Sequence, residues 1–318
     1  MQEQLRDIMM VTAGMYGKRY SKRQKSRFAA YIQNTAKKAR LPFRVPAAGN
    51  GSDVRNLILG DLKKARLVIV CSYDTPSKAL LPGTVWYPFH ASKTLEGEKK
   101  ELIFRIAAAV FFLAAYAALV VLTGFGSLGW KAVPFHILAA FISFKLILGI
   151  ANRYNFRRSS ATLAVVLNIL RENTSKDIAY VFLDRTANGY EGFDALREED
   201  KNLIDKKITL FLGSLGKGSH LCLASGGIRE ITKSKMLYYP EEGIGGLTME
   251  KISVTEESKE RCPMFCFERG LYLIQADSME DGEPVLTGTR RKTDCEADFS
   301  QLVQIYELIQ KNIDRFIR

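Results

Sequence analysis

The stretch LVIVCSYDTP, from Leu67 to Pro76, determines the fold class of this chain. Its first five residues are apolar and mostly β-branched, which is typical of a short buried strand in a parallel sheet. The polar residues Ser72 and Asp74 follow directly. Because α/β proteins place their chemistry at the carboxyl ends of such strands, we expect the functional site to lie beside Ser72.

The charge of the chain is strongly positive and unevenly distributed. Its 318 residues are enough for a full α/β core, and its net charge is +12. The cationic residues of the N-terminal region are Lys18, Arg19, Lys22, Arg23, Lys25, Arg27, Lys37, Lys38, Arg40 and Arg44. Such a cluster suits an anionic membrane surface or nucleic acid. Since no nucleic-acid-binding motif accompanies it, we expect membrane lipids as partners and no nucleic acid.

Two apolar stretches interrupt the polar chain and predict a transmembrane hairpin over residues 101–152. The first, Ile106–Gly124, carries no charge and is long enough to cross a membrane at about 1.5 Å per residue. The second, Ala132–Ala151, carries only Lys145, which lies close enough to its end to reach the interface. A buried hairpin in a soluble core is the alternative. Such a helix would show a polar face, and the first stretch shows none.

The residues that flank the hairpin predict its orientation. Cationic residues precede the first stretch and follow the second: Lys99, Lys100, Arg105, Arg153, Arg157 and Arg158. The connecting loop has Lys131 alone, so the positive-inside rule places both termini and the α/β domain in the cytoplasm. Five cysteines without a framework spacing agree with a reducing compartment.

The segments outside the hairpin alternate between strand and helix patterns. This alternation predicts a three-layer αβα sandwich around a mixed, mostly parallel sheet. The predicted strands are 56–60, 67–71, 178–183, 208–212, 220–224 and 271–275, and the predicted helices are 21–39, 161–170, 192–206 and 299–317. The chain would then comprise a basic N-terminal helical segment (1–45), the first part of the α/β domain (46–100), the hairpin (101–152) and the rest of the domain (153–318).

The order and spacing of these segments resemble the di-zinc aminopeptidase family, clan MH metallopeptidases. This family includes bacterial leucyl aminopeptidase and the glutaminyl cyclases. The resemblance covers residues 20–317 and is greatest to the membrane-embedded bacterial branch, in which a hairpin interrupts the fold at this point. In the family, the strand equivalent to LVIVC ends in His-Tyr-Asp-Thr-Pro, whose histidine binds metal. This chain has Ser72 in place of that histidine and keeps Asp74, which orients the histidine in relatives.

The resemblance also implies the other ligand positions, and none of them carries a competent side chain here. Arg158 stands where the aspartate of Asn-Asp-Asn-x-Ser-Gly bridges the two zinc ions. Thr186 and Ala187 replace the general base and the ligand of Asp-x-Glu-Glu-x-Gly. Gly213 replaces the aspartate of Phe-Asp-x-x-Gly, and Gly288 replaces the histidine of His-Thr-x-x-Asp-Thr.

These replacements predict that the chain is a pseudopeptidase. A zinc ion in a peptidase site needs about four N, O or S ligands, and Arg158 adds a positive charge where the metal would lie. We therefore predict no zinc, no other cofactor and no catalytic residue. We expect a membrane-anchored binding or scaffold subunit, whose partner is a membrane complex or an active relative. We also expect Arg158 to pair with Asp74 and so to replace the charge of the metal.

Two alternatives remain open. The first is an active peptidase or other hydrolase with a rebuilt, non-zinc site, for which the nearby candidate groups are Ser72, Asp74, Asp184 and Glu191. The second is a membrane-surface electrostatic module that binds anionic lipid or nucleic acid through its basic N-terminal helix.

Overall fold

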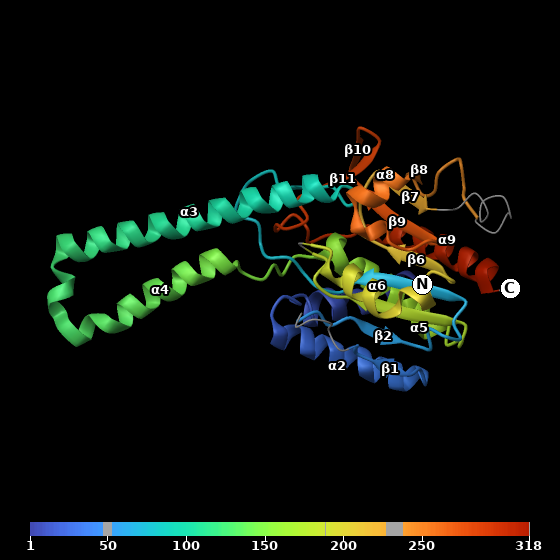
Figure 1. Cartoon of the computed structure of the whole chain (residues 1–318), viewed down its shortest axis with the longest axis horizontal. Helices are drawn as coiled ribbons and strands as arrows, with labels where there is room; N and C mark the ends of the chain where they lie inside the picture. The colour runs from blue at the N-terminus through green and yellow to red at the C-terminus, as the bar shows by residue number, and fades with distance from the viewer. Residues whose placement is uncertain (47–52, 188, 227–237, 318) are drawn as a thin grey trace.

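The computed structural model describes residues 1–46, 53–187, 189–226 and 238–317 (Figure 1). Within these ranges the main sheet has the strand order β1-β2-β5-β3-β6-β9-β7-β8. Strands β5, β3, β6 and β9 run parallel, whereas β2 and β7 pair antiparallel with their inner neighbours β5 and β9. The strands are β1 (Phe43–Arg44), β2 (Leu57–Leu59), β3 (Leu67–Ser72), β5 (Ile178–Leu183), β6 (Ile208–Leu212), β7 (His220–Gly226), β8 (Thr248–Val254) and β9 (Gly270–Ala276). The predicted mixed, mostly parallel sheet is confirmed.

Helices cover both faces of this sheet, and this confirms the three-layer αβα sandwich. The covering helices are α1 (Gln2–Met9), α2 (Lys22–Ala39), α5 (Ala161–Glu172) and α9 (Phe299–Ile317) on one face, with α6 (Glu191–Ile204) and the turn after α8 (Glu256–Arg261) on the other. The alternation along β3 separates the two cores. Leu67 and Ile69 face the first set of helices, whereas Val68 and Val70 face the second.

The N-terminal helices are part of the same layered structure. Leu5 and Ile8 of α1 are fully buried, as are Phe28 and Ile32 of α2, and all four belong to the core that includes β3 and α5. Ser21 caps α2 by accepting the N–H of Gln24, while the Gln24 side chain accepts the N–H of Ser21. This capping box fixes the start of the helix.

A second, smaller sheet was not predicted from the sequence. It joins β10 (Ser278–Glu280), β11 (Glu283–Thr287) and β4 (Val85–Trp86) in that order. Its strands are short and carry no sustained alternation of apolar and polar residues, so their pairing depends on contacts between distant segments.

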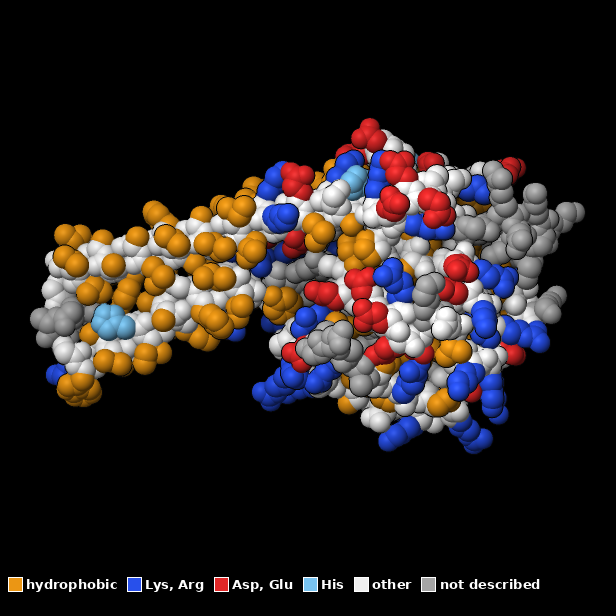
Figure 2. All heavy atoms as spheres, viewed as in Figure 1, with side chains coloured by type: hydrophobic (Ala, Val, Ile, Leu, Met, Phe, Trp, Pro, Cys, Tyr) orange, Lys and Arg blue, Asp and Glu red, His pale blue; other side chains and the backbone are white. Residues whose placement is uncertain are grey.

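Two helices form a hairpin that projects from the α/β domain (Figure 1). They are α3 (Ala91–Thr123) and α4 (Val133–Leu148). By length and composition, α3 and the segment Gly129–Leu148, which includes α4, could each cross a membrane. Apolar side chains cover the hairpin on the face that Figure 2 shows. Only 6% of the apolar window of α3 and 17% of that of the α4 segment is buried within the chain. The alternative of a buried soluble-core hairpin is therefore wrong for this chain.

Buried charged residues fix the base of the hairpin to the domain. Glu101 and Arg105 form an ion pair one turn apart on α3, with 2.9 Å between Oε1 and Nε. Glu101 also accepts the N–H groups of Leu80 and Leu81, and Arg105 donates to Ser77 Oγ at 2.8 Å. Ser77, Leu80 and Leu81 belong to the loop that follows β3. These contacts therefore attach the hairpin to the segment that leaves the central strand of the sheet.

Candidate functional site

The ligand positions implied by the family resemblance meet at the carboxyl ends of β3, β5 and β6. One small cavity is lined by Ser72, Asp74, Arg158, Thr186, Ala187 and Gly213, together with Trp86, Ser159, Thr162, Phe193, Phe211 and Met264. Gly288 does not line it. The cavity measures about 20 Å³, roughly the room for a single water molecule. The structure thus brings all of the named positions except Gly288 together around one cavity, which is too small for a peptide.

Large apolar side chains that the sequence analysis missed form much of the wall. Trp86 comes from β4 in the small sheet, and Met264 comes from the turn after α8. The Arg158 guanidinium carbon lies 3.1 Å from the centroid of the Trp86 ring. A cation over an indole face is attractive by about 2 kcal/mol when it is desolvated. Arg158 and Trp86 therefore fill space beside the positions that the resemblance equates with zinc ligands.

The predicted ion pair between Arg158 and Asp74 is wrong. The Asp74 carboxylate instead accepts the N–H and hydroxyl of Thr186, at 3.2 and 2.9 Å, and the N–H of Ala187 at 3.1 Å. Arg158 Nη2 donates to the carbonyl of Ala187 at 2.6 Å. The turn at Thr186–Ala187 therefore hydrogen-bonds to both charged groups, although Arg158 Nη1 has no hydrogen-bond partner in the described part of the chain. Burial raises the pKa of Asp74 and lowers that of Arg158 to about 9.

The residues at this site do not fit a zinc ion. Among the described residues, no group of three or more His, Cys, Asp or Glu side chains could hold a metal. A Cβ added at Gly213 would lie 2.5 Å from the Ile274 side chain, so even an aspartate at this position would require Ile274 to move. The buried guanidinium of Arg158 would repel a divalent cation. No catalytic step through zinc is therefore derived for this chain.

Arg19 is a buried residue, although its sequence context placed it among the surface cations. Its side chain is fully buried between the N-terminal segment and the end of β3. Nε donates to the carbonyl of Tyr73, Nη1 donates to that of Thr12 at 2.6 Å, and Nη2 donates to Ser159 Oγ at 2.7 Å. Burial lowers the pKa of Arg19 to about 10. Arg19 thus links the backbone of the N-terminal segment to the backbone of Tyr73 and to the Ser159 side chain.

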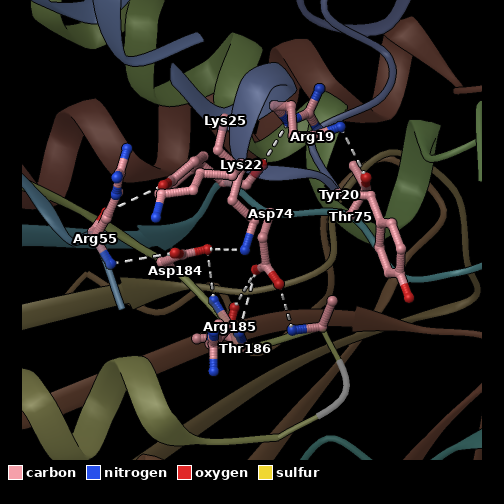
Figure 3. Close-up of polar contacts among 12 residues, drawn as sticks. Arg19, Tyr20, Lys22, Lys25, Arg55, Asp74, Thr75, Asp184, Arg185 and Thr186 are labelled. Carbon is pink, nitrogen blue, oxygen red and sulfur yellow. Dashed lines mark hydrogen bonds and ion pairs between the residues drawn. The ribbon is translucent and has the colours of Figure 1, made fainter. Parts of the chain in front are cut away.

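A larger, open pocket shares Asp74 and Ala187 with this cavity. Figure 3 shows several of the side chains that line the pocket and the polar contacts among them. It measures about 390 Å³ and is lined mainly by charged side chains. Lys25 Nζ lies 2.5 Å from Asp184 Oδ1, and Asp184 also accepts the backbone N–H groups of Arg55 and Arg185. Three of the four groups nominated for a rebuilt site, Asp74, Asp184 and Glu191, line this pocket, whereas Ser72 lines only the small cavity.

Asp294 supports the turn that carries Arg158. Its Oδ1 accepts the N–H of Arg157 at 2.7 Å, while Oδ2 has no hydrogen-bond partner in the described part of the chain. Burial raises the pKa of Asp294 to about 7, against the hydrogen bonds and positive charges of Arg157 and Arg158. No sequence pattern indicates a role for Asp294, because the turn and Asp294 meet only in the folded structure.

Asp294 is expected to make the chain less stable as the pH rises from about 4 to about 7. In this window the folded chain retains a proton that the unfolded chain, with an aspartate pKa of about 3.9, has released. The stability that the proton supplies is present below pH 4 and is lost as the pH rises through about 7. The unfolding temperature of the wild type should therefore fall between pH 5 and pH 8, and that of Asp294→Asn should fall by about 5 °C less. Asp281→Asn is the control, because that side chain is 90% exposed. Parallel pH profiles of wild type and Asp294→Asn would contradict the assignment.

Several solved structures have a fold similar to that of this chain. The chain is similar to a Zn-dependent exopeptidase from Parabacteroides distasonis, at 10% identity over 100% of this chain and 98% of that one, with a TM-score of 0.58. It is also similar to Porphyromonas gingivalis glutaminyl cyclase, at 11% identity over 99% and 98%, with a TM-score of 0.56. The Legionella pneumophila LapA aminopeptidase gives 8% identity over 99% and 69%, with a TM-score of 0.54. No family model and no curated protein matches the sequence. The chain thus has the aminopeptidase-like fold that the sequence predicted.

Proposed function

We propose that this chain is a non-catalytic, aminopeptidase-like protein that is anchored in a membrane and acts as a binding or scaffold subunit. One observation carries the proposal. The resemblance equates six positions with the zinc ligands and the general base, and all of them except Gly288 line a cavity of about 20 Å³, namely Ser72, Arg158, Thr186, Ala187 and Gly213. Peptide hydrolysis in this fold needs a metal-activated water and room for substrate. The described residues offer no zinc ligand set here, and this cavity by itself has no room for a peptide.

The hairpin supports membrane anchoring. Its apolar side chains have few partners within the chain, and burying them in hydrocarbon would stabilise each by about 1.5–3 kcal/mol for a large side chain. The positive flanks support an orientation with the α/β domain and both termini on the cytoplasmic side. The Glu101–Arg105 anchor would then hold the sheet at a fixed position relative to the membrane.

The open charged pocket supports a binding role for the domain. At about 390 Å³ it is in the size range of small-ligand or peptide-terminus sites. Its pairing of Lys25 with Asp184 suits a charged, hydrogen-bonding partner more than an apolar one. We propose that the partner is a protein, either a membrane complex or an active relative of this chain, and that the domain binds no nucleic acid.

The proposal predicts that the purified full-length chain hydrolyses no peptide. A panel of aminoacyl anilides and N-terminal glutaminyl peptides should give turnover no higher than a buffer blank. The P. gingivalis glutaminyl cyclase serves as the positive control. Turnover that chelator abolishes would contradict the proposal.

The alternative of a rebuilt hydrolase is favoured by one observation, the convergence of Asp74, Asp184 and Glu191 on the open pocket. It predicts turnover that survives chelator and disappears in Asp184→Asn. Asp53→Asn is the matched control, because Asp53 lines the same pocket with a side chain that is 66% exposed. Absence of turnover in the wild type removes this alternative for the substrates tested.

A further inference from the structure

A second open hollow lies at the end of the domain next to the hairpin, and we term it the basic hollow. It measures about 540 Å³ and is lined by Gly14, Met15, Tyr16, Gly17, Lys18, Gln24, Arg27, Ala30 and Arg153. Three lining residues are cationic and none is acidic. Lys18, Arg27 and Arg153 are exposed, and none of them forms an ion pair with any residue that the structure describes.

Contacts with the hairpin fix the position of this hollow. Arg153 follows the last residue of α4, Leu148, by five positions. The Tyr20 hydroxyl donates to the carbonyl of Leu148 at 2.6 Å, and Asn155 Nδ2 donates to the carbonyl of Gly17 at 3.1 Å. Helix α2 starts at this end and runs away from the hairpin (Figure 1). The hollow therefore lies where α4 enters the domain.

The rim of the hollow carries an exposed apolar residue as well as the cations. Met15 is 76% exposed, and Met10 on the same N-terminal segment is 67% exposed. A site that combines unpaired cations with exposed thioether side chains matches a phospholipid, whose phosphate is anionic and whose chains are apolar. A soluble phosphate would use the cations but gain nothing from the methionines.

We propose that the basic hollow binds the phosphate headgroup of an anionic lipid. This inference rests on the membrane anchoring proposed above and names the lipid class that the anchored domain recognises. With the hairpin inserted, the hollow would be at the level of the cytoplasmic headgroups, and a lipid could reach Lys18, Arg27 and Arg153 without leaving the bilayer. The first turns of α2 would then be part of one defined lipid site, whereas the cations at the far end of α2 would attract anionic lipids only through their charge.

The test is lipid retention by the full-length chain in detergent, measured by native mass spectrometry. The protein is delipidated and then titrated with phosphatidylglycerol or phosphatidylcholine. The triple variant Lys18→Gln, Arg27→Gln, Arg153→Gln should bind phosphatidylglycerol about 100-fold more weakly than wild type. The control variant Lys37→Gln, Lys38→Gln, Arg40→Gln removes the same charge from the far end of α2 and should stay within about twofold.

Several outcomes would overturn the proposal. One is an equal loss of binding in the two triple variants, and another is equal wild-type affinity for the two lipids. Displacement of phosphatidylglycerol by millimolar inorganic phosphate would assign the hollow to a soluble phosphate instead. Membrane fractionation of both variants separates this result from a failure of anchoring, because the unaltered hairpin should keep both in the membrane.

Discussion

Replacing Arg19 by methionine is expected to destabilise the folded chain by about 3–5 kcal/mol. The substitution keeps a long apolar stem but removes the donors that satisfy the carbonyls of Thr12, Tyr16 and Tyr73. A buried carbonyl that loses its partner costs about 1–3 kcal/mol. The carbonyls of Tyr16 and Tyr73 would lose the Arg19 donor, whereas that of Thr12 would keep the longer hydrogen bond from Ser160 Oγ at 3.4 Å. Removing the guanidinium also removes the free-energy penalty of burying its charge, and this offsets part of the loss. The penalty is present because Arg19 has no carboxylate within ion-pair distance in the described structure.

The measurement is the unfolding temperature of the detergent-solubilised chain, which should fall by about 10 °C. Arg23→Met is the matched control, since Arg23 is an exposed cation of the same region and should shift the temperature little. If Arg19→Met and Arg23→Met unfold together, Arg19 does not hold the N-terminal segment to β3.

Introducing an arginine in the middle of α3 is expected to impair membrane insertion. Phe111 is 76% exposed in the chain, so Phe111→Arg would cost nothing in water and about 2.5–3.5 kcal/mol in a bilayer. Leu95→Arg is the control on the same helix, because Leu95 is also exposed but lies in the polar first part of α3. The two variants therefore separate a membrane span from an exposed helix in water.

Carbonate-resistant membrane association after expression measures this effect. We expect Phe111→Arg to shift a large share of the chain to the aggregated or degraded fraction, with Leu95→Arg like wild type. Equal membrane association of the two variants, or a fully soluble wild type, would contradict a transmembrane hairpin.

The parts of the fold that could be predicted are those in which local pattern and packing agree. β5 and α9 have the bounds that their apolar patterns predict, and β3 is longer than predicted by one residue, Ser72. The hairpin was evident because its residues are apolar on every side. Helix α3, however, begins at Ala91, well before the apolar stretch, because buried ion pairs at its base stabilise turns that appear polar in the sequence.

The site could be located from the sequence, but its contacts could not be predicted. Asp74 takes its hydrogen bonds from a turn that begins at Arg185, whose φ is 51°, and no pattern predicts that turn. Trp86 meets Arg158 because β4 pairs with β11, some 200 residues away in sequence. Arg19 was assigned to the surface because neighbouring lysines and arginines are exposed, and charge counting does not distinguish the one that is buried.

The zinc content of the purified full-length chain tests the central claim most directly. The protein is expressed with added zinc, purified without chelator and analysed by inductively coupled plasma mass spectrometry, with the P. gingivalis glutaminyl cyclase prepared in parallel. Because the residues at Ser72, Arg158, Ala187 and Gly213 offer no ligand set, we predict less than about 0.1 zinc per chain. About one or two tightly held zinc ions per chain would contradict the proposal that the site has lost its metal.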